Sequence, residues 1–464
     1  MSKKRSILRL LPLIFAGVVV VWILSSTYSR QSPPPPTLST PKERANALFS
    51  ASNPTSALPS HLAAHLLHED YAGETDANST SPSFRSYLAN LIKPSSSSST
   101  SPSSPTSLST SSFTREEGRQ RLANPFQAPP PTSFSDIDIV YTWTDGSREW
   151  YRRLLVSTFG RTEGEAKGSR YKDNGELRYS FRSLFQHVPE FRHLYLVTFD
   201  ERMVPDWLKI EAKKEGSRVT LVPHSAIFRG KKLHSHLPTF NSNAIEVNLW
   251  RIPGLSEYFL YVNDDYFFAR KAEVGDYISD KGEVKVYAEK HIVEPGLRYF
   301  TLKDEKKQLW RSTVVHSNLL LDDVYGQQSR RFMKHSPHLW RRSAWAAMWY
   351  IFQDELMATS ASKFRASTDI DPRLLAGWFW IGEKRAFPAV AVETEKSDAF
   401  AHLLMVSKDD KKVAGVLKDM FGRMPNSGPK VFCLNDNVPR TESTAKAVNG
   451  VLSMMFPTRS PVEV

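Results

Sequence analysis

The composition of the chain changes abruptly at Asp136, and this change limits where a globular fold can form. Residues 31–135 are rich in Ser, Pro and Thr, with prolines at 33–36 and serines at 95–99. Such a segment cannot bury enough apolar surface to offset the conformational entropy lost on folding. We therefore predict a disordered stalk over residues 31–135 and one globular domain over residues 136–464.

An apolar run near the N-terminus predicts a membrane anchor. The eighteen residues 7–24 are predominantly apolar, and Lys3, Lys4 and Arg5 precede them. At the helical rise this run spans about 27 Å, close to the roughly 30 Å of a bilayer core. Basic residues before the run favour a cytoplasmic N-terminus. We predict a tail and signal anchor over residues 1–30, with a cleaved signal peptide as the alternative.

This layout is typical of a single-pass type II membrane enzyme, whose domain faces the lumen of the Golgi or of another secretory compartment. Asn78-Ser79-Thr80 is a glycosylation sequon, which fits an exposed lumenal stalk. Cys433 is the only cysteine, so no internal disulfide can form and the core must hold by packing.

The net charge of +12 favours an anionic partner, which could be nucleic acid, acidic lipid, acidic glycan or a nucleotide-sugar. No block of Lys and Arg alternates with aromatic residues as in a nucleic-acid groove. We therefore expect no nucleic-acid partner.

From residue 136 onward, short apolar strand patterns alternate with helical ones. Strands are predicted at residues 137–143, 194–199, 219–222, 258–262 and 431–434, and helices at residues 176–187, 207–214 and 343–357. This alternation predicts an α/β fold, a Rossmann-like mostly parallel sheet with flanking helices. In such folds functional groups gather at the carboxyl ends of the strands.

Two acidic turns follow predicted strands. Asn263, Asp264 and Asp265 come directly after residues 258–262, and Asn435 and Asp436 follow residues 431–434. Adjacent carboxylates at a strand end can hold a divalent cation, Mg or Mn, which in turn binds a diphosphate. An ordinary Asn-Asp turn is the alternative interpretation of each.

Other groups could take part in catalysis, each with a plain structural alternative. Glu246 lies in a helix that Asn241 or Ser242 could cap. His335 and His338 flank Pro337, and histidine is the usual general base near neutral pH. Arginines could bind phosphate, although they are common on solvated faces; the candidates here are Arg341, Arg342 and Arg365.

Several stretches, in order along the chain, resemble the conserved regions of the Stealth family. They are IDIVYTWTDG at 137–146, DNGELRYSFRS at 173–183, the segments 237–246, 251–255 and 259–265, HSPHLWRR at 335–342 with 364–370, and CLND at 433–436 with 456–463. The family includes an animal N-acetylglucosamine-1-phosphotransferase, bacterial capsule phosphotransferases and a fungal xylosylphosphotransferase. Unlike the animal enzyme, this chain lacks Cys-rich modules between Asp265 and His335.

The resemblance implies a Stealth-like catalytic domain that transfers a sugar-1-phosphate from a nucleotide-sugar to a hydroxyl of a glycan or glycoprotein. The donor is expected to be a UDP-sugar, and a nucleoside monophosphate would be released. The family's active-site positions fall on Asp265, His335, Arg365 and Glu246. Metal ligation is expected from Asp264, Asp265, Asp436 and Asn435. Substrate binding is expected from Asp145, Arg178, Arg182, Asn241, Arg251 and Arg341.

The choice of general base, between His335 and an acidic residue, stays open at this point, as do the donor sugar and a homo-oligomeric state. Two other functions also stay open. A conventional metal-dependent glycosyltransferase would release a nucleoside diphosphate, and an inactive glycan-binding protein would use the same pocket without chemistry.

Overall fold

The computed structural model describes residues 40–49, 128–159, 175–209, 218–297, 309–405, 428–435 and 442–464, with single positions at 415 and 422. The predicted anchor at residues 7–24 and the sequon at Asn78 lie outside these residues. Within the described ranges, no helix combines the length and apolar character needed to cross a membrane.

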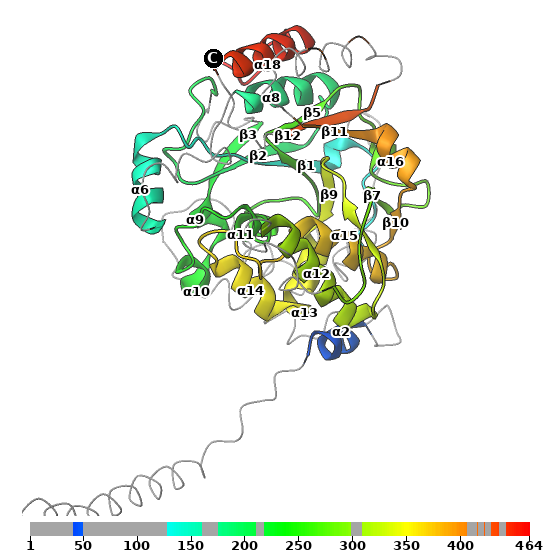
Figure 1. Cartoon of the computed structure of the whole chain (residues 1–464). Helices are drawn as coiled ribbons and strands as arrows, with labels where there is room; N and C mark the ends of the chain where they lie inside the picture. The colour runs from blue at the N-terminus through cyan, green and yellow to red at the C-terminus, as the bar shows by residue number, and fades with distance from the viewer. Residues whose placement is uncertain are drawn as a thin grey trace, which may run out of the picture.

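The core of the fold is a five-stranded sheet in the order β3-β2-β1-β4-β9 (Figure 1). Strands β1 to β4 are parallel, and only β9 runs antiparallel to its neighbour. The bounds are β1 Ile137–Thr142, β2 His193–Thr198, β3 Val219–Pro223, β4 Tyr258–Asn263 and β9 His338–Arg341. The predicted α/β fold with a mostly parallel sheet is therefore confirmed.

Three smaller sheets flank the central one. A three-stranded sheet has the order β11-β12-β5, and two strand pairs are β10-β6 and β7-β8. The bounds are β5 Tyr266–Phe268, β6 Val284–Val286, β7 Ala288–Val293, β8 Arg330–Met333, β10 Ala389–Ala391, β11 Ala401–Met405 and β12 Val431–Asn435. Because β5 follows β4 after a two-residue turn, the predicted acidic turn joins the central sheet to the three-stranded one.

Both faces of the central sheet are covered by helices, as a parallel sheet requires. In β1, Ile137, Ile139 and Val140 are all fully buried. Figure 1 shows α8 and α18 on one side and α11, α13 and α14 on the other. The helices after β1 are α6 Glu149–Phe159, α8 Glu176–His187, α9 His224–Ile227, α10 Gly230–His234, α11 Ser242–Glu246, α12 Leu309–Tyr325, α13 Arg342–Ile351, α14 Gln353–Ala361, α15 Pro372–Gly382, α16 Thr394–Phe400 and α18 Glu442–Met455. One 3-10 turn, Phe134–Asp136, leads into β1, and two others are Leu249–Arg251 and Val274–Asp276.

Two predicted helices differ from the structure. The helix predicted at 343–357 is interrupted at Phe352, whose φ of −107° and ψ of 38° separate α13 from α14. At 207–209 the structure has a turn and an isolated bridge from Leu208 to Glu463, and residues 210–214 are not described. Val464 N donates to Trp207 O (3.0 Å), so the C-terminal segment occupies a carbonyl that would otherwise accept the first hydrogen bond of the predicted helix.

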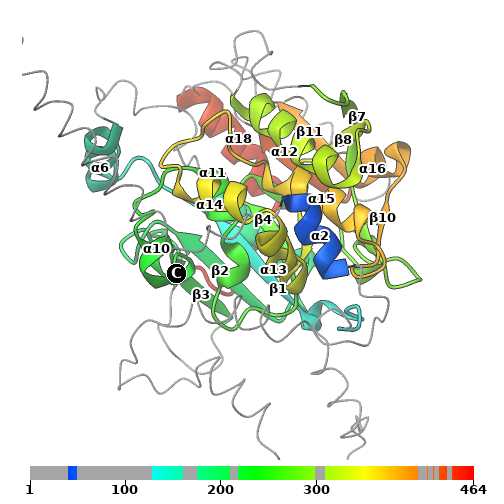
Figure 2. The ribbon, with the colours of Figure 1, turned by 90° about the horizontal axis from the view of Figure 1, so that it is seen from below.

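Part of the predicted stalk is ordered, which corrects the prediction for residues 41–49. Helix α2, Pro41–Phe49, packs against α12 and α13 (Figure 2). Its first turn is a capping box: Thr40 N donates to Glu43 Oε2 (2.7 Å), and Glu43 N donates to Thr40 Oγ1 (3.3 Å). Pro41 occupies the first helical position, where its missing N–H costs nothing. The Thr-Pro-Lys-Glu sequence was therefore a readable helix-start signal.

Candidate active site

The acidic turn lies at the carboxyl edge of the central sheet. Parallel pairing sets Thr142, the last residue of β1, opposite Asn263, the last residue of β4. Tyr261 donates its hydroxyl hydrogen to Asn263 Oδ1 (2.6 Å), which fixes the start of the turn. Asp264 and Asp265 follow at once and lead into β5. Strand register therefore puts these carboxylates where parallel α/β proteins bind their ligands.

Asp265 is held against β12 and keeps one oxygen available. Cys433 donates its thiol hydrogen to Asp265 Oδ2 (3.3 Å), and Leu434 N donates to Asp265 O (3.0 Å). The other oxygen, Oδ1, is buried and has no hydrogen-bond partner among the described residues. Burial raises the pKa of Asp265 to about 6, and the Glu176 carboxylate acts in the same direction.

The pairing of β12 with β5 also places the second acidic turn. Cys433 lies opposite Tyr266 in this antiparallel pair. Leu434, the residue before Asn435, is hydrogen-bonded to Asp265 O through its N–H (3.0 Å). Asp436 lies outside the described residues. Asn435, the described residue of the second acidic turn, therefore lies near Asp265 of the first.

Glu246 is a buried carboxyl at the end of α11. Asn241 caps this helix, since its side chain accepts from Asn243 N (3.2 Å), which confirms one of the two predicted caps. Burial raises the pKa of Glu246 to about 7, although Arg373 and Arg365 lower it. Its Oε2 atom has no hydrogen-bond partner within the described ranges. A carboxyl that titrates near 7 with one oxygen unsatisfied is chemically poised to accept a proton.

The two histidines reach the same edge because β9 is antiparallel. His338, its first residue, lies opposite Tyr261 of β4. The segment that enters β9, including His335, therefore begins at the carboxyl ends of the parallel strands. Burial, together with the charge of the nearby Arg373, lowers the pKa of both imidazoles to about 3. Both rings are therefore neutral at physiological pH.

Arg373 links these groups, and sequence reasoning missed it. It stands in the first turn of α15, where Asp371 caps the helix by accepting from Leu374 N (3.0 Å). Arg373 Nη2 lies 3.3 Å from Asp371 Oδ2. Its charge acts on Glu246, Asp265 and His335, whose pKa values it lowers. The Asp-Pro pair before it was a helix-start signal, but nothing in the sequence told where the arginine would point.

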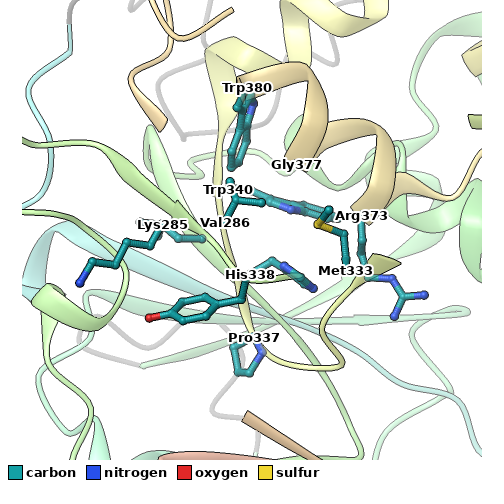
Figure 3. A pocket seen from close by; sticks show the side chains of 11 residues that line it. Lys285, Val286, Met333, Pro337, His338, Trp340, Arg373, Gly377 and Trp380 are labelled. Carbon is teal, nitrogen blue, oxygen red and sulfur yellow. The ribbon is translucent and has the colours of Figure 1, made fainter. Parts of the chain in front are cut away.

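Figure 3 shows a small pocket whose lining includes Arg373, His338 and Gly377. A Cβ at Gly377 would lie 2.7 Å from Met333 Sδ and 3.1 Å from Val286 Cγ1. The glycine therefore allows α15 to pack closely against β6 and β8. This contact sets the depth at which the first turn of α15, and with it Arg373, enters the site.

Arg365 approaches Glu246 from the segment before α15. Its Nη2 donates to Ser242 Oγ (2.6 Å) at the start of α11, and its charge lowers the pKa of Glu246 and of Asp371. Asn241 Nδ2 donates to Asp369 Oδ2 (2.7 Å), which ties the same segment to α11. The structure thus brings Glu246, Arg365, His335 and Asp265 around Arg373.

Two regions of the chain match models of conserved Stealth segments: residues 170–286 match Stealth protein CR2, conserved region 2, and residues 334–382 match Stealth protein CR3, conserved region 3. The chain belongs to the Stealth family. Glu246, Asp264 and Asp265 lie in the first matched region, and His335, Arg365 and Arg373 lie in the second.

Curated relatives of this Stealth protein are named exopolysaccharide phosphotransferases. One from Streptomyces coelicolor is 31% identical over 333 residues, covering 70% of this chain and 57% of that protein. One from Nocardia farcinica is 30% identical over 344 residues, covering 72% and 63%. One from Mycobacterium tuberculosis, CpsY, is 29% identical over 338 residues, covering 71% and 58%. The Stealth protein thus spans somewhat more than half the length of these relatives.

Among solved structures, the galactosyltransferase LgtC aligns with 70% of this Stealth protein and 98% of its own chain, at 10% identity and a TM-score of 0.33. At that score the likeness carries no information on activity.

Three other predicted substrate-binding residues, all arginines, make structural contacts in this Stealth protein. Arg178 Nε and Arg182 Nε each lie 2.8 Å from a carboxylate oxygen of Glu463, near the C-terminus. Arg251 lies over the rings of Trp250 and Trp349, at 4.2 and 4.4 Å from their centroids. These contacts stabilise the fold, and substrate binding by these arginines stays a prediction.

Arg341 and Asp145 complete the predicted set. Arg341 Nε donates to Glu257 Oε1 (2.8 Å), so it joins the start of β4 to the end of β9. Asp145, three residues after β1, pairs with Arg148 Nε at 2.9 Å. We therefore leave both outside the proposed site.

The acidic turn fits a divalent cation in part. The described residues of this Stealth protein contain no group of three or more His, Cys, Asp or Glu that could hold a metal ion. They do contain two adjacent carboxylates, one of which has a buried oxygen without a partner. Mg²⁺ is commonly held by one or two carboxylates, with substrate phosphates and water as its other ligands. Asp264 and Asp265 suit that arrangement.

Proposed function

We propose that this Stealth protein is a sugar-1-phosphotransferase, which moves a sugar-1-phosphate from a nucleotide-sugar to a hydroxyl of an acceptor glycan. The observation that carries the proposal is the gathering of Glu246, His335, Arg365 and Asp265 around Arg373. The family membership and the names of the relatives support the same class of activity.

In the proposed reaction the acceptor oxygen attacks the phosphorus that bears the sugar. A new P–O bond forms, and the bond from that phosphorus to the oxygen of the nucleoside monophosphate breaks. The product is a sugar phosphodiester, and a nucleoside monophosphate leaves with the bond's electron pair. The acceptor's proton must pass to a base in the site.

Glu246 is the proposed general base. A base works best when its pKa lies near the working pH, and burial holds the pKa of Glu246 near 7. Its unsatisfied Oε2 is the atom that would take the proton. His335, with a pKa near 3, is a weak base in the unliganded protein. Its neutral ring is better suited to donate a hydrogen bond that orients substrate.

The two arginines are the proposed phosphate ligands. Hydrogen bonds from guanidinium to phosphate are charge-assisted and roughly twice as strong as neutral ones. Arg365 and Arg373 both lie near enough to Glu246 for their charges to lower its pKa. They would stabilise the charge that develops on the phosphoryl oxygens in the transition state.

Asp264 and Asp265 are the proposed ligands of a divalent cation, with Asn435 and Asp436 as further candidates. When bound, Mg²⁺ or Mn²⁺ would neutralise charge on the donor diphosphate. We also propose, on the sequence alone, that residues 7–24 anchor the enzyme as a type II protein in a Golgi or other secretory membrane.

The test is to identify the nucleotide released across a panel of UDP-sugars with a glycan acceptor. Release of UMP, with a phosphodiester resonance in the phosphorus NMR spectrum of the product, supports the proposal. Release of UDP with a phosphorus-free glycoside would establish the conventional glycosyltransferase instead. A protein that binds glycans but turns over no donor would be the inactive alternative.

A further inference from the structure

Helix α2 is separated from the rest of the described domain by residues 50–127, yet it packs on the helices behind the candidate site. Arg44 Nε donates to Ile351 O (2.8 Å), and Arg44 Nη2 lies 3.6 Å from Asp354 Oδ2. Arg44 and Ala45 are only 8% and 5% exposed. A long charged side chain is rarely so buried unless it has a partner.

Arg44 meets the point at which the predicted long helix is interrupted. Ile351 is the last residue of α13, and carbonyl groups in the last turn of a helix lack intrahelical partners. The guanidinium of Arg44 donates to the Ile351 carbonyl, and its positive charge is the one that a helix C-terminus favours. Asp354 and Glu355 lie in the first turn of α14 and bring acidic groups to the same place. Burial raises the pKa of Glu355, and the charge of Arg44 opposes this rise. One side chain of α2 therefore joins α13 to α14.

The helices under α2 also hold the candidate site. Trp349 of α13 donates from Nε1 to Val247 O (2.7 Å), one residue after Glu246. Ser317 of α12 accepts from Asp371 N (2.7 Å), at the start of the helix that carries Arg373. Both supports are buried, so a shift of α12 or α13 would move the residues around the site.

We propose that α12, α13 and the start of α14 form a docking surface whose occupant is α2, and that α2 stays bound there when the connection through residues 50–127 is cut. The segment 50–127 would then be tied to the domain at both of its ends, through α2 and through residue 128. The docking rests on the contacts of Arg44 and Ala45 alone. Only its effect on turnover rests on the proposed function.

The experiment uses the full chain, solubilised in detergent, with a site-specific protease sequence inserted in the serines at 95–99. After cleavage, the N-terminal fragment should stay with the domain through gel filtration under native conditions. If the two fragments of the cleaved wild-type protein separate during gel filtration, the proposal is overturned. Because association is measured without substrate, this outcome is distinct from a failure of the proposed function.

Three substitutions sharpen the test. Ala45→Asp puts a carboxylate into the packed face and should release the fragment. Arg44→Ala should weaken reassociation about 10- to 150-fold, as expected for one hydrogen bond to a charged group. Lys42→Ala, on the exposed side of the same helix, should change nothing. Retention of the Ala45→Asp fragment as tightly as the unsubstituted one would also overturn the proposal.

Turnover of the same variants gives a second readout. Ala45→Asp should lower the melting temperature and the rate of donor turnover together, and Lys42→Ala should leave both unchanged. A synthetic peptide of residues 38–50, added to a cleaved chain from which the N-terminal fragment has been removed, should restore the melting temperature.

Discussion

Arg373 Nη2 lies 3.3 Å from Asp371 Oδ2, and this short i,i+2 contact at the start of α15 holds a cation among the acidic and imidazole groups of the site. Asp371 is itself fixed twice, since it accepts from Leu374 N and donates its own N–H to Ser317. Burial would raise the pKa of Asp371, but the charge of Arg373 and the cap hydrogen bond from Leu374 N lower it. The charged pair persists at neutral pH, and Arg373 is left to act on Glu246 and Asp265.

Replacing Arg373 tests this arrangement. Arg373→Ala should lower kcat/KM about 10- to 150-fold if one charge-assisted contact to phosphate is lost. Arg373 lowers the pKa of Glu246, so its removal should also move the pH dependence of kcat/KM to higher pH. Arg385→Ala, at an exposed position, is the control. A loss of rate without any shift of the pH profile would mean that Arg373 does not act on the base.

Glu246→Gln separates activity from stability. Loss of the proton acceptor should reduce the rate about 100- to 10,000-fold. Burial raises the pKa of Glu246 from 4.5 to about 7, so the wild-type protein loses stability as pH rises between these values. The glutamine side chain of the variant does not ionise, so the variant does not lose this stability as pH rises. The variant should gain up to about 3 kcal/mol relative to wild type at pH 8 and nothing at pH 4, measured by urea denaturation.

His335→Asn tests which group is the base. If Glu246 takes the proton, this variant should be slower yet retain a rise in kcat/KM with pH near 7. The imidazole, with a pKa near 3, does not titrate in that range in the free protein. Disappearance of the rise near pH 7 in His335→Asn, with its retention in Glu246→Gln, would reverse the assignment.

Asp265→Asn tests the proposed cation site. The variant should lose activity while its thermal melt changes little, because the amide keeps an oxygen able to accept from the Cys433 thiol. Exhaustive chelation of the wild-type protein should abolish turnover, and Mg²⁺ or Mn²⁺ should restore it. A calorimetric titration of the metal should show weaker binding to the variant. Full turnover after chelation would rule out the metal.

Glu463→Gln tests the C-terminal segment. The guanidinium of Arg182, a backbone N–H and Arg178 hold the pKa of the Glu463 carboxyl at about 2, below its usual 4.5. The ion pairs therefore stabilise the fold above pH 4.5, and this contribution is lost as pH falls toward 2. The variant should be about 1–2 kcal/mol less stable at pH 7, allowing for screening at the partly exposed Arg178. Denaturation curves of variant and wild type should converge at low pH.

Local sequence patterns predicted much of this protein. The apolar run before Asn263 and the periodicity of residues 176–187 fixed β4 and α8, because period and capping act over a few residues. The acidic turn was placed at a strand end for the same reason. Asn241 as a helix cap is equally local, since its side chain reaches only two residues ahead.

Contacts between distant segments were decided only by the tertiary structure. Whether an arginine meets substrate, a carboxylate or a ring depends on what packs opposite it, and Arg178, Arg251 and Arg373 look alike in the sequence. Arg373 lies in the site because Gly377 lets α15 pack closely against β6 and β8. Arg178 pairs with Glu463 because the C-terminal segment lies beside α8. Likewise, Arg44 bonds the carbonyl of Ile351 at the end of α13, 307 residues further along the chain. The sequence by itself determined the helices, the strands and the polar residues at their ends, because these depend on neighbours a few residues away. Which of those polar residues come into contact was decided by the packing of distant segments.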